Sequence, residues 1–222
     1  MKQNLSDDVR QELNLDIDWR ITEEGYNVIR KTLRELRATN ILEFGSGAST
    51  IRIAREFPSL QITTVEHDKR FCESTLQLAA TFGVSDQIKL MHCPLRNIWI
   101  KGRRFLTYQE PKFAGIFDFI LIDGPPGQTR RGREACLYFS YGHLRVGGVV
   151  ILDDIKRLSE QRILKNWMSI YGKSVSLAVF DSGNGLAVLR KTNDNRKKQV
   201  SIRCLLDNYA VLLCGSRFNY RA

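Results

Sequence analysis

The stretch "ILEFGSGAST", residues 41–50, decides the fold that this sequence predicts. A short apolar run leads into two glycines, Gly45 and Gly47, and the small residues after them favour the start of a helix. Glycines after a first strand permit a tight turn and a close approach of the backbone to a ligand, while the N-terminus of the following helix attracts negative charge. A turn of this kind usually holds part of a nucleotide.

The chain on either side of this turn alternates between helical and strand-like patterns. Helices are predicted near residues 22–39, 49–56, 69–82, 130–144 and 159–171. Short apolar runs lie between them, at 40–44, 61–66, 87–93, 116–123 and 147–154. Buried runs separated by helices predict βαβ units and a parallel sheet. The turn sequence "DSGNG" (181–185) between the last two apolar runs predicts a terminal hairpin, and hence an antiparallel strand at the edge of the sheet.

Length and composition favour a cytoplasmic protein with one main domain. The 222 residues divide into an N-terminal extension (1–21), a domain (22–190) and a C-terminal tail (191–222), whose apolar stretch 200–215 fits a helix or a strand equally well. Neither a membrane span nor a signal peptide is predicted. The five cysteines are odd in number and form no C-x-x-C pair, so reduced thiols are expected.

The net charge of +10 suits nucleic acid, an anionic substrate or a solvated surface. The basic clusters "KGRR" (101–104), "TRRGR" (129–133) and "NRKK" (195–198) do not interleave with aromatic residues as a stacking platform would. We therefore favour a small-molecule partner, with nucleic acid as the alternative.

Two acids near the glycine turn point to a cationic ligand. A dinucleotide-binding G-x-G-x-x-G would place its third glycine at position 50, where this chain has Thr50. Glu43 would repel a pyrophosphate but suits S-adenosylmethionine (SAM), which carries a sulfonium and an ammonium group. Glu66, in "VEHD" nineteen residues after Gly47, would accept both ribose hydroxyls at the end of the second strand. The alternative is that Glu43 caps the turn and Glu66 is a surface acid.

With "FDFILIDGPPG" (117–127), "LRVGGVVILDD" (144–154) and the terminal hairpin in order, residues 22–190 resemble the class I SAM-dependent methyltransferases. The resemblance implies an α/β, Rossmann-like, seven-stranded and mostly parallel sheet with an antiparallel terminal hairpin and helices on both faces. It also implies that SAM lies over the ends of the first two strands, near the fourth. The residues implied to line SAM are Glu43, Gly45, Ser46, Gly47, Ser49, Glu66 and Asp123, with His92 and Cys93 near the adenine.

Three aspartates should meet beside the methyl group, because Asp123 ends the fourth strand while Asp153 and Asp154 end the fifth. Crowded carboxylates repel one another unless a cation or protons intervene, and Mg²⁺ or Mn²⁺ would serve. The pattern is similar to metal-dependent O-methyltransferases of the catechol and sugar type, which implies that all three bind the metal. Without a metal, Asp123 or Asp154 would act as general base.

The acceptor is less well specified. Catechol enzymes carry a lysine three residues after the first Asp, where this chain has Pro126, so a sugar or another hydroxylated metabolite is favoured over a phenol. The "DGPPG" loop is similar to those of uncharacterised bacterial methyltransferases and plant glucuronoxylan O-methyltransferases. Base methylation is disfavoured because Gly127 stands where an aromatic residue belongs.

Basic residues after "DGPPG" would hold an anionic substrate, or else pair with the aspartates: Arg130, Arg131 and Arg133. Residues 94–115 form a longer connection than usual, interpreted either as a substrate lid or as a helix across the sheet.

The sequence thus predicts metal-assisted O-methylation of a small hydroxylated, sugar-like or anionic acceptor. Nucleic-acid methylation and a non-catalytic SAM-binding module remain as alternatives.

Overall fold

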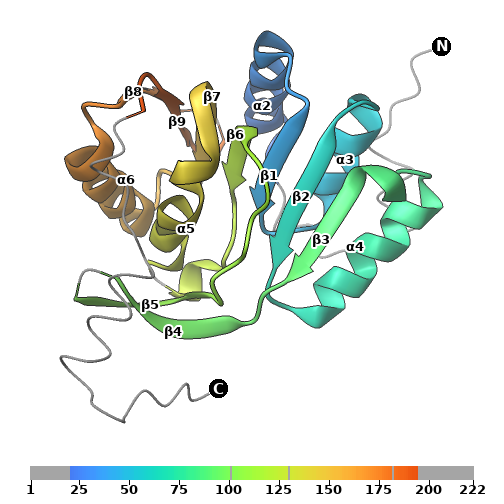
Figure 1. Cartoon of the computed structure of the whole chain (residues 1–222), viewed down its shortest axis with the longest axis horizontal. Coiled ribbons are helices and arrows are strands. Elements are labelled where there is room, and N and C mark those ends of the chain that lie inside the picture. Colours follow the sequence, from blue (N-terminus) through green and yellow to red (C-terminus); the bar gives the residue numbers. More distant parts are fainter. Residues whose placement is uncertain (1–20, 101, 130, 182, 195–222) are drawn as a thin grey trace.

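The structure is a computed structural model that describes residues 21–194, except 101, 130 and 182. Within these residues the strands build a seven-stranded sheet in the order β3-β2-β1-β6-β7-β9-β8 (Figure 1). The strands of this sheet are β1 (Asn40–Phe44), β2 (Gln61–Glu66), β3 (Ile88–His92), β6 (Phe117–Ile122), β7 (Leu144–Asp153), β8 (Val175–Phe180) and β9 (Leu186–Lys191).

The sheet is parallel from β3 to β7, and the terminal hairpin closes it. Strand β9 pairs antiparallel with both β7 and β8, so the antiparallel strand lies next to the edge and β8 forms the edge itself. The predicted α/β, Rossmann-like sheet with its antiparallel hairpin is therefore confirmed.

Strand β1 shows why the sheet forms at the centre of the molecule. Leu42 and Phe44 point into the core on one face, while Ile41 points into the core on the other, and all three are fully buried. Parallel strands covered on both faces require such continuous apolar runs rather than alternation with polar residues.

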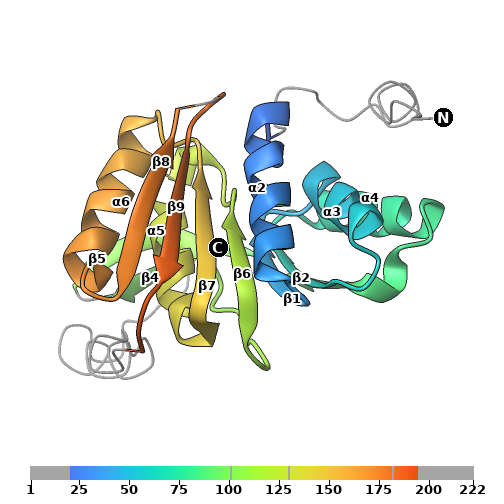
Figure 2. The same ribbon diagram turned by 90° about the horizontal axis from the view of Figure 1, so that it is seen from above.

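Helices cover both faces of the sheet, as predicted (Figure 2). One face carries α2 (Glu23–Leu36), α3 (Ala48–Glu56) and α4 (Lys69–Thr81), and the other carries α5 (Gly132–Ser140) and α6 (Leu158–Tyr171). Helix α2 begins at the predicted N-cap, where the Thr22 hydroxyl accepts a hydrogen bond from the Gly25 N–H at 3.2 Å. Short 3₁₀ turns are η2 (Ser85–Gln87), η3 (Gly127–Thr129) and η4 (Tyr141–His143).

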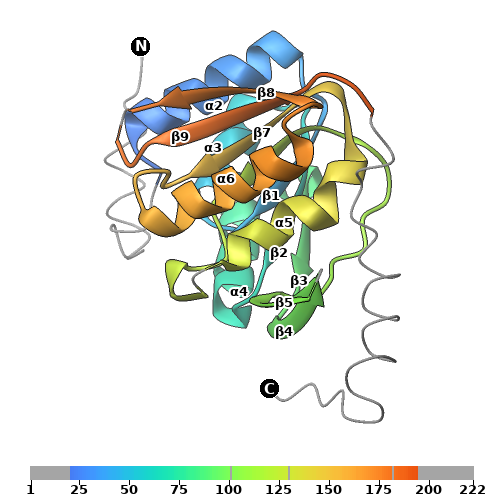
Figure 3. The same cartoon turned by 90° about the vertical axis from the view of Figure 1, so that its left-hand side faces the viewer.

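The connection after β3 is a second, two-stranded sheet, so its interpretation as a helix is wrong. Strands β4 (Leu95–Ile100) and β5 (Arg103–Tyr108) pair antiparallel, with Ile98 opposite Phe105. Both of these side chains are buried in the core shared with α5 and α6, because a strand places alternate residues on one face. This β4–β5 hairpin leads away from the end of β3 and lies below α5 (Figures 1 and 3).

Three further predictions concern the terminal segments, membrane spans and cysteines. Residues 1–20 and 195–222, and with them nearly all of the predicted extension and tail, lie outside the described residues. No helix in the described part is long and apolar enough to span a membrane. The described cysteines, Cys72, Cys93 and Cys136, are buried and unbridged.

Candidate cofactor and acceptor site

The glycine turn after β1 is held close to the turn after β6. The Gly45 N–H donates to the Val65 carbonyl at 2.8 Å, and Gly45 has a φ of +96°. A Cβ on Gly45 would lie 3.1 Å from the Gly124 nitrogen, so the two turns approach only because residue 45 is glycine. Gly47 has a φ of +144°, and a Cβ there would meet no atom within 4 Å. The turn therefore leaves open space beside the N-terminus of α3.

Glu43 lies beneath this turn and is fully buried. Its carboxylate accepts hydrogen bonds from the hydroxyls of Ser49, at 2.6 Å, and Thr50, at 2.5 Å. Burial raises the pKa of Glu43 to about 7, although the two hydroxyls oppose the shift. The structure thus brings Glu43 and Ser49 together, and the Glu43 carboxylate holds the first turn of α3 through these two hydrogen bonds.

Glu66 ties the glycine turn to the end of β2. One carboxylate oxygen accepts from the Ser46 N–H at 3.0 Å, and the other from the N–H groups of His67, at 2.6 Å, and Asp68, at 2.9 Å. Burial alone would raise the pKa of Glu66, but the hydrogen bonds from His67, Asp68 and Ser46 hold it below its usual value. Glu66 is therefore a buried, hydrogen-bonded anion rather than a surface acid.

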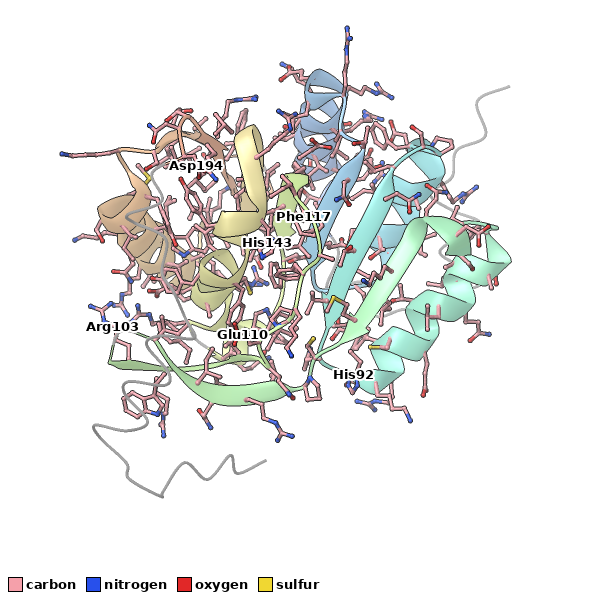
Figure 4. The ribbon with its side chains drawn as sticks, viewed as in Figure 1. His92, Arg103, Glu110, Phe117, His143 and Asp194 are labelled. Carbon is pink, nitrogen blue, oxygen red and sulfur yellow. The ribbon has the colours of Figure 1, made fainter. Side chains whose placement is uncertain are left out.

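The two residues predicted near the adenine lie at the carboxyl end of β3, at the same end of the sheet as Glu66. His92 ends β3, where Figure 4 labels it, and its Nε2 lies 3.1 Å from the His67 carbonyl oxygen. The Cys93 N–H donates to the Glu66 carbonyl at 2.7 Å, and burial raises the pKa of the Cys93 thiol. The structure places both residues next to Glu66; contact with adenine stays a prediction.

The three predicted aspartates meet at the ends of β6 and β7. Asp123 follows β6, Asp153 ends β7 and Asp154 comes next, each offering a carboxylate oxygen within 4.8 Å of the others. Asp154 has a φ of +62°, which is uncommon outside glycine. Burial, followed by the charges of Asp123 and Asp154, raises the pKa of Asp153 to about 7. We refer to Asp123, Asp153 and Asp154 as the aspartate cluster.

A buried arginine reaches into the aspartate cluster from α5. Arg133 is 4% exposed, and its guanidinium lies 3.0 Å from an Asp154 carboxylate oxygen and 3.4 Å from one of Asp123. It also donates to the Pro125 carbonyl at 3.1 Å. The geometry therefore favours pairing with the aspartates over the predicted binding of a substrate anion by Arg133.

Of the other two predicted arginines, the structure describes only Arg131, which has a partner outside the aspartate cluster. Arg131 pairs with Glu134, and its guanidinium lies 5.5 Å from the centre of the Phe105 ring. Arg130 lies outside the described residues. Substrate binding by both stays a prediction.

Two further residues of the site belong to none of the motifs recognised in the sequence. Glu160, 1% exposed, lies 4.0 Å from the Arg133 guanidinium and adds a fourth acid. Tyr108, at the end of the β4–β5 hairpin, is fully buried against Gly124. An alternating strand pattern over 103–108 is the only signal that could have placed Tyr108, and the basic residues there obscure it.

Solved structures share this fold. The chain has the class I methyltransferase fold. An O-methyltransferase from Streptomyces achromogenes involved in tomaymycin synthesis, solved with SAM, is 16% identical with a TM-score of 0.61, over 80% of this chain and 83% of that one. An O-methyltransferase from Bacillus cereus, solved with S-adenosylhomocysteine, is 17% identical with a TM-score of 0.58, over 78% and 84%.

A methyltransferase from Podospora anserina, also bound to S-adenosylhomocysteine, is 15% identical with a TM-score of 0.60, over 79% of this chain and 81% of that one. No family model matches the chain, and no curated protein matches its sequence. These likenesses establish the methyltransferase fold.

Proposed function

We propose that this protein is a SAM-dependent methyltransferase that methylates an oxygen of a small hydroxylated acceptor. One observation carries the proposal: a glycine turn with open space at Gly47 lies beside the aspartate cluster, on the adjacent strand ends of β1 and β6. A cationic nucleoside bound at this turn would lie next to groups suited to handle protons or cations.

The chain's own residues supply partners for each polar part of SAM. The N-terminus of α3 suits its carboxylate, and the Asp123 carboxylate suits its ammonium group. The Glu66 oxygen that accepts from the Ser46 N–H at 3.0 Å has the Ser46 hydroxyl as its second donor only at 3.5 Å, and a ribose hydroxyl would replace that long contact.

The acceptor hydroxyl would meet the aspartate cluster at Asp123. Asp153 and Asp154 are 6% and 5% exposed, whereas the Asp123 side chain is 24% exposed. Burial raises the pKa of Asp123, although Arg133 opposes the shift. A carboxylate with a raised pKa is suited to take the proton of a hydroxyl as the methyl group is transferred.

We propose further that Asp123, Asp153 and Asp154 bind Mg²⁺ or Mn²⁺. The donor set fits, because hard divalent ions prefer carboxylate oxygens. Acids also outnumber cations in the cluster: with Glu160, four acids face two guanidinium groups among the described residues, those of Arg133 and Arg157. When bound, such an ion would coordinate the acceptor hydroxyl and lower its pKa. Arg133 competes for two of the three carboxylates.

Calorimetry with SAM tests the cofactor. We expect a micromolar dissociation constant, about −8 kcal/mol, and strong weakening by Glu66→Ala. Binding of NAD but not of SAM would show that the glycine turn is misinterpreted. Binding of SAM without methyl transfer to any acceptor would favour the non-catalytic module.

Nucleic-acid methylation is the second candidate, favoured by Arg103 and Arg104, which are exposed on the β4–β5 hairpin beside the site (Figure 4 labels Arg103). Transfer from labelled SAM is to be measured on RNA, DNA and a small-molecule extract. A polynucleotide substrate would bind with an affinity that falls steeply with salt. Labelling confined to the polynucleotide would replace the small-acceptor proposal.

A further inference from the structure

We propose that the apolar segment at residues 200–215 of this chain packs into a groove between α6 and β8. The inference does not depend on the proposed methyl transfer. It joins two features that the proposed function leaves without a role: an exposed apolar strand at the edge of the sheet, and an apolar stretch in the C-terminal tail.

The groove is lined by apolar side chains from one helix and one strand. Helix α6 contributes Leu164 and Met168, and β8 contributes Leu177, Val179 and Phe180. The three side chains of β8 are 39%, 56% and 41% exposed, in that order. Figure 2 shows α6 lying beside β8. Single exposed apolar residues are ordinary, but neighbouring ones that line a groove form a contiguous patch, and such patches mark interaction sites.

Strand β8 also has an uncovered backbone edge in the described part of the chain. It ends the seven-stranded sheet, and β9 is the only described strand that pairs with it. Residues 176–180 are all exposed, and none of them is charged. Proteins usually cover an apolar edge strand or place charges on it, because it pairs readily with other segments. A covering segment is therefore expected along β8.

The chain leaves the described structure next to this groove. The Thr192 N–H donates to the Ser174 carbonyl at 2.8 Å, so the end of the described chain lies beside the residue that precedes β8. Ser174 is three residues from Leu177, about 10 Å along an extended strand. Residues 195–200 can span about 20 Å when extended. The segment that begins at position 200 can therefore reach the groove.

The sequence of this segment suits a strand edge. Val200, Ile202 and Cys204 alternate with the polar residues Ser201 and Arg203. Such alternation is the pattern of a strand that buries one face. An extended peptide can add to an exposed sheet edge through its backbone while alternate side chains fill a neighbouring groove.

Attachment to the same chain favours this occupant over a separate molecule. A segment joined to its site by a short linker has an effective concentration in the millimolar range. A second copy of the chain, or another protein, would have to displace a segment that is always present at that concentration. We therefore assign the groove to residues 200–215 of the same chain.

Disulfide trapping in the full chain tests the assignment. The tail carries two cysteines, Cys204 and Cys214, whereas the described cysteines are buried. Val179→Cys adds a thiol inside the groove. Under mild oxidation we expect this thiol to form a disulfide with Cys204 or Cys214 of the same chain. Mass spectrometry of the digested protein identifies the bridge, and a non-reducing gel shows whether the product is a monomer.

Val146→Cys is the matched control. Val146 is 49% exposed, close to the 56% of Val179, and does not line the groove. It also lies near the start of the tail, since the Arg190 guanidinium donates to the Gly147 carbonyl at 3.0 Å. The tail can thus reach both positions. If the segment occupies the groove, Val179→Cys should form the bridge about 10-fold faster or more.

A second pair of variants tests packing without a cross-link. Ile202→Asp places a charge in the apolar segment, and Ser201→Asp places the same charge at the adjacent polar position. Ile202→Asp should lower the melting temperature of the full chain by about 2–4 °C or more. It should also slow the bridge in Val179→Cys. Ser201→Asp should change neither result.

Several results would overturn the assignment. Equal bridging of Val179→Cys and Val146→Cys, or no bridge in either, would show that the tail does not occupy the groove. A bridged product with the mass of a dimer would assign the groove to a second copy of the chain. An unchanged melting temperature in Ile202→Asp would show that the segment is not packed. None of these measurements involves SAM, so failure of the proposed function is a separate result.

Discussion

The guanidinium of Arg133 and the carboxylate of Asp154 form a buried ion pair, with 3.0 Å between nitrogen and oxygen and side chains only 5% and 7% exposed. The same guanidinium lies 3.4 Å from Asp123. Arg133 is thus the cation that now balances two of the acids proposed to handle the acceptor or a metal. The stability and the chemistry of the site are linked through this one residue.

Replacing Arg133 by leucine should destabilise the protein strongly. The variant leaves Asp123, Asp154 and Glu160 without their buried cation, and breaking such a pair costs about 3–5 kcal/mol. If the acids also form a cation site, Mg²⁺ or Mn²⁺ should raise the melting temperature of Arg133→Leu more than that of the wild type. Thermal melts with and without the ions measure both effects.

Arg52 gives the control for this experiment. It pairs with Glu23 at 2.7 Å, but both side chains are substantially exposed. Arg52→Leu should therefore cost no more than about 1 kcal/mol and show no response to divalent ions. Equal ion responses in the two variants would argue against a cation site at the aspartates.

The sequence predicted the parts of the site that depend on the backbone. Apolar runs and glycines determine where β1, β6 and β7 end, so the meeting of Asp123 with Asp153 followed from strand order. For Arg133 the sequence left two roles open, binding of a substrate anion and pairing with the aspartates, because the choice depends on the rotation of α5 about its axis. The β4–β5 hairpin was missed because exposed arginines interrupt its alternation, which is the main signal of a strand.

Substituting Gly47 by alanine should weaken SAM binding beyond its effect on stability. With a φ of +144° the residue favours glycine, so the substitution strains the backbone, by roughly 1–3 kcal/mol. The added methyl group meets no protein atom and occupies the space proposed for the cofactor. Calorimetry with SAM, beside denaturant unfolding, separates the two effects.

Gly83 is the matched control, since it has a φ of +65° and a Cβ there also meets nothing within 4 Å. It follows α4, away from the glycine turn. Gly83→Ala should lower stability but leave SAM affinity unchanged. Equal loss of affinity in both variants would mean that backbone strain, not the cofactor site, explains the result.

Glu43 should make stability depend on pH. Its pKa in the folded protein is about 7, above the ordinary value of 4.5, so the folded state holds the proton more tightly than the unfolded state. The resulting stabilisation is complete below pH 4.5 and is lost as the pH rises to 7, by an amount on the order of 3 kcal/mol.

Glu43→Gln removes this titration and keeps a side chain of similar size. Denaturant unfolding at pH 5 and pH 8 should show a smaller loss of stability in the variant than in the wild type. Asp153 titrates in the same range, so the difference between the two proteins is the relevant quantity. Equal losses would show that the buried carboxylate of Glu43 does not hold its proton to pH 7.

The proposed metal gives the last prediction. If a divalent ion is bound by Asp123, Asp153 and Asp154, a chelator should abolish methyl transfer while SAM binding stays nearly intact, because the glycine turn and Glu66 lie on other strands. Added Mg²⁺ or Mn²⁺ should restore transfer. Asp153→Asn removes one anionic ligand and should raise the metal concentration needed, whereas Asp86→Asn, an exposed substitution in η2, should not.

Full activity in excess chelator would eliminate the metal and leave proton transfer to the protein. Asp123 or Asp154 would then act as general base, and transfer should fall as that carboxylate is protonated at low pH. The pH profile of Asp123→Asn would distinguish Asp123 from Asp154 as the base. The fall in methyl transfer at low pH disappears only when the base itself is removed. Retention of that fall in Asp123→Asn would assign the proton to Asp154.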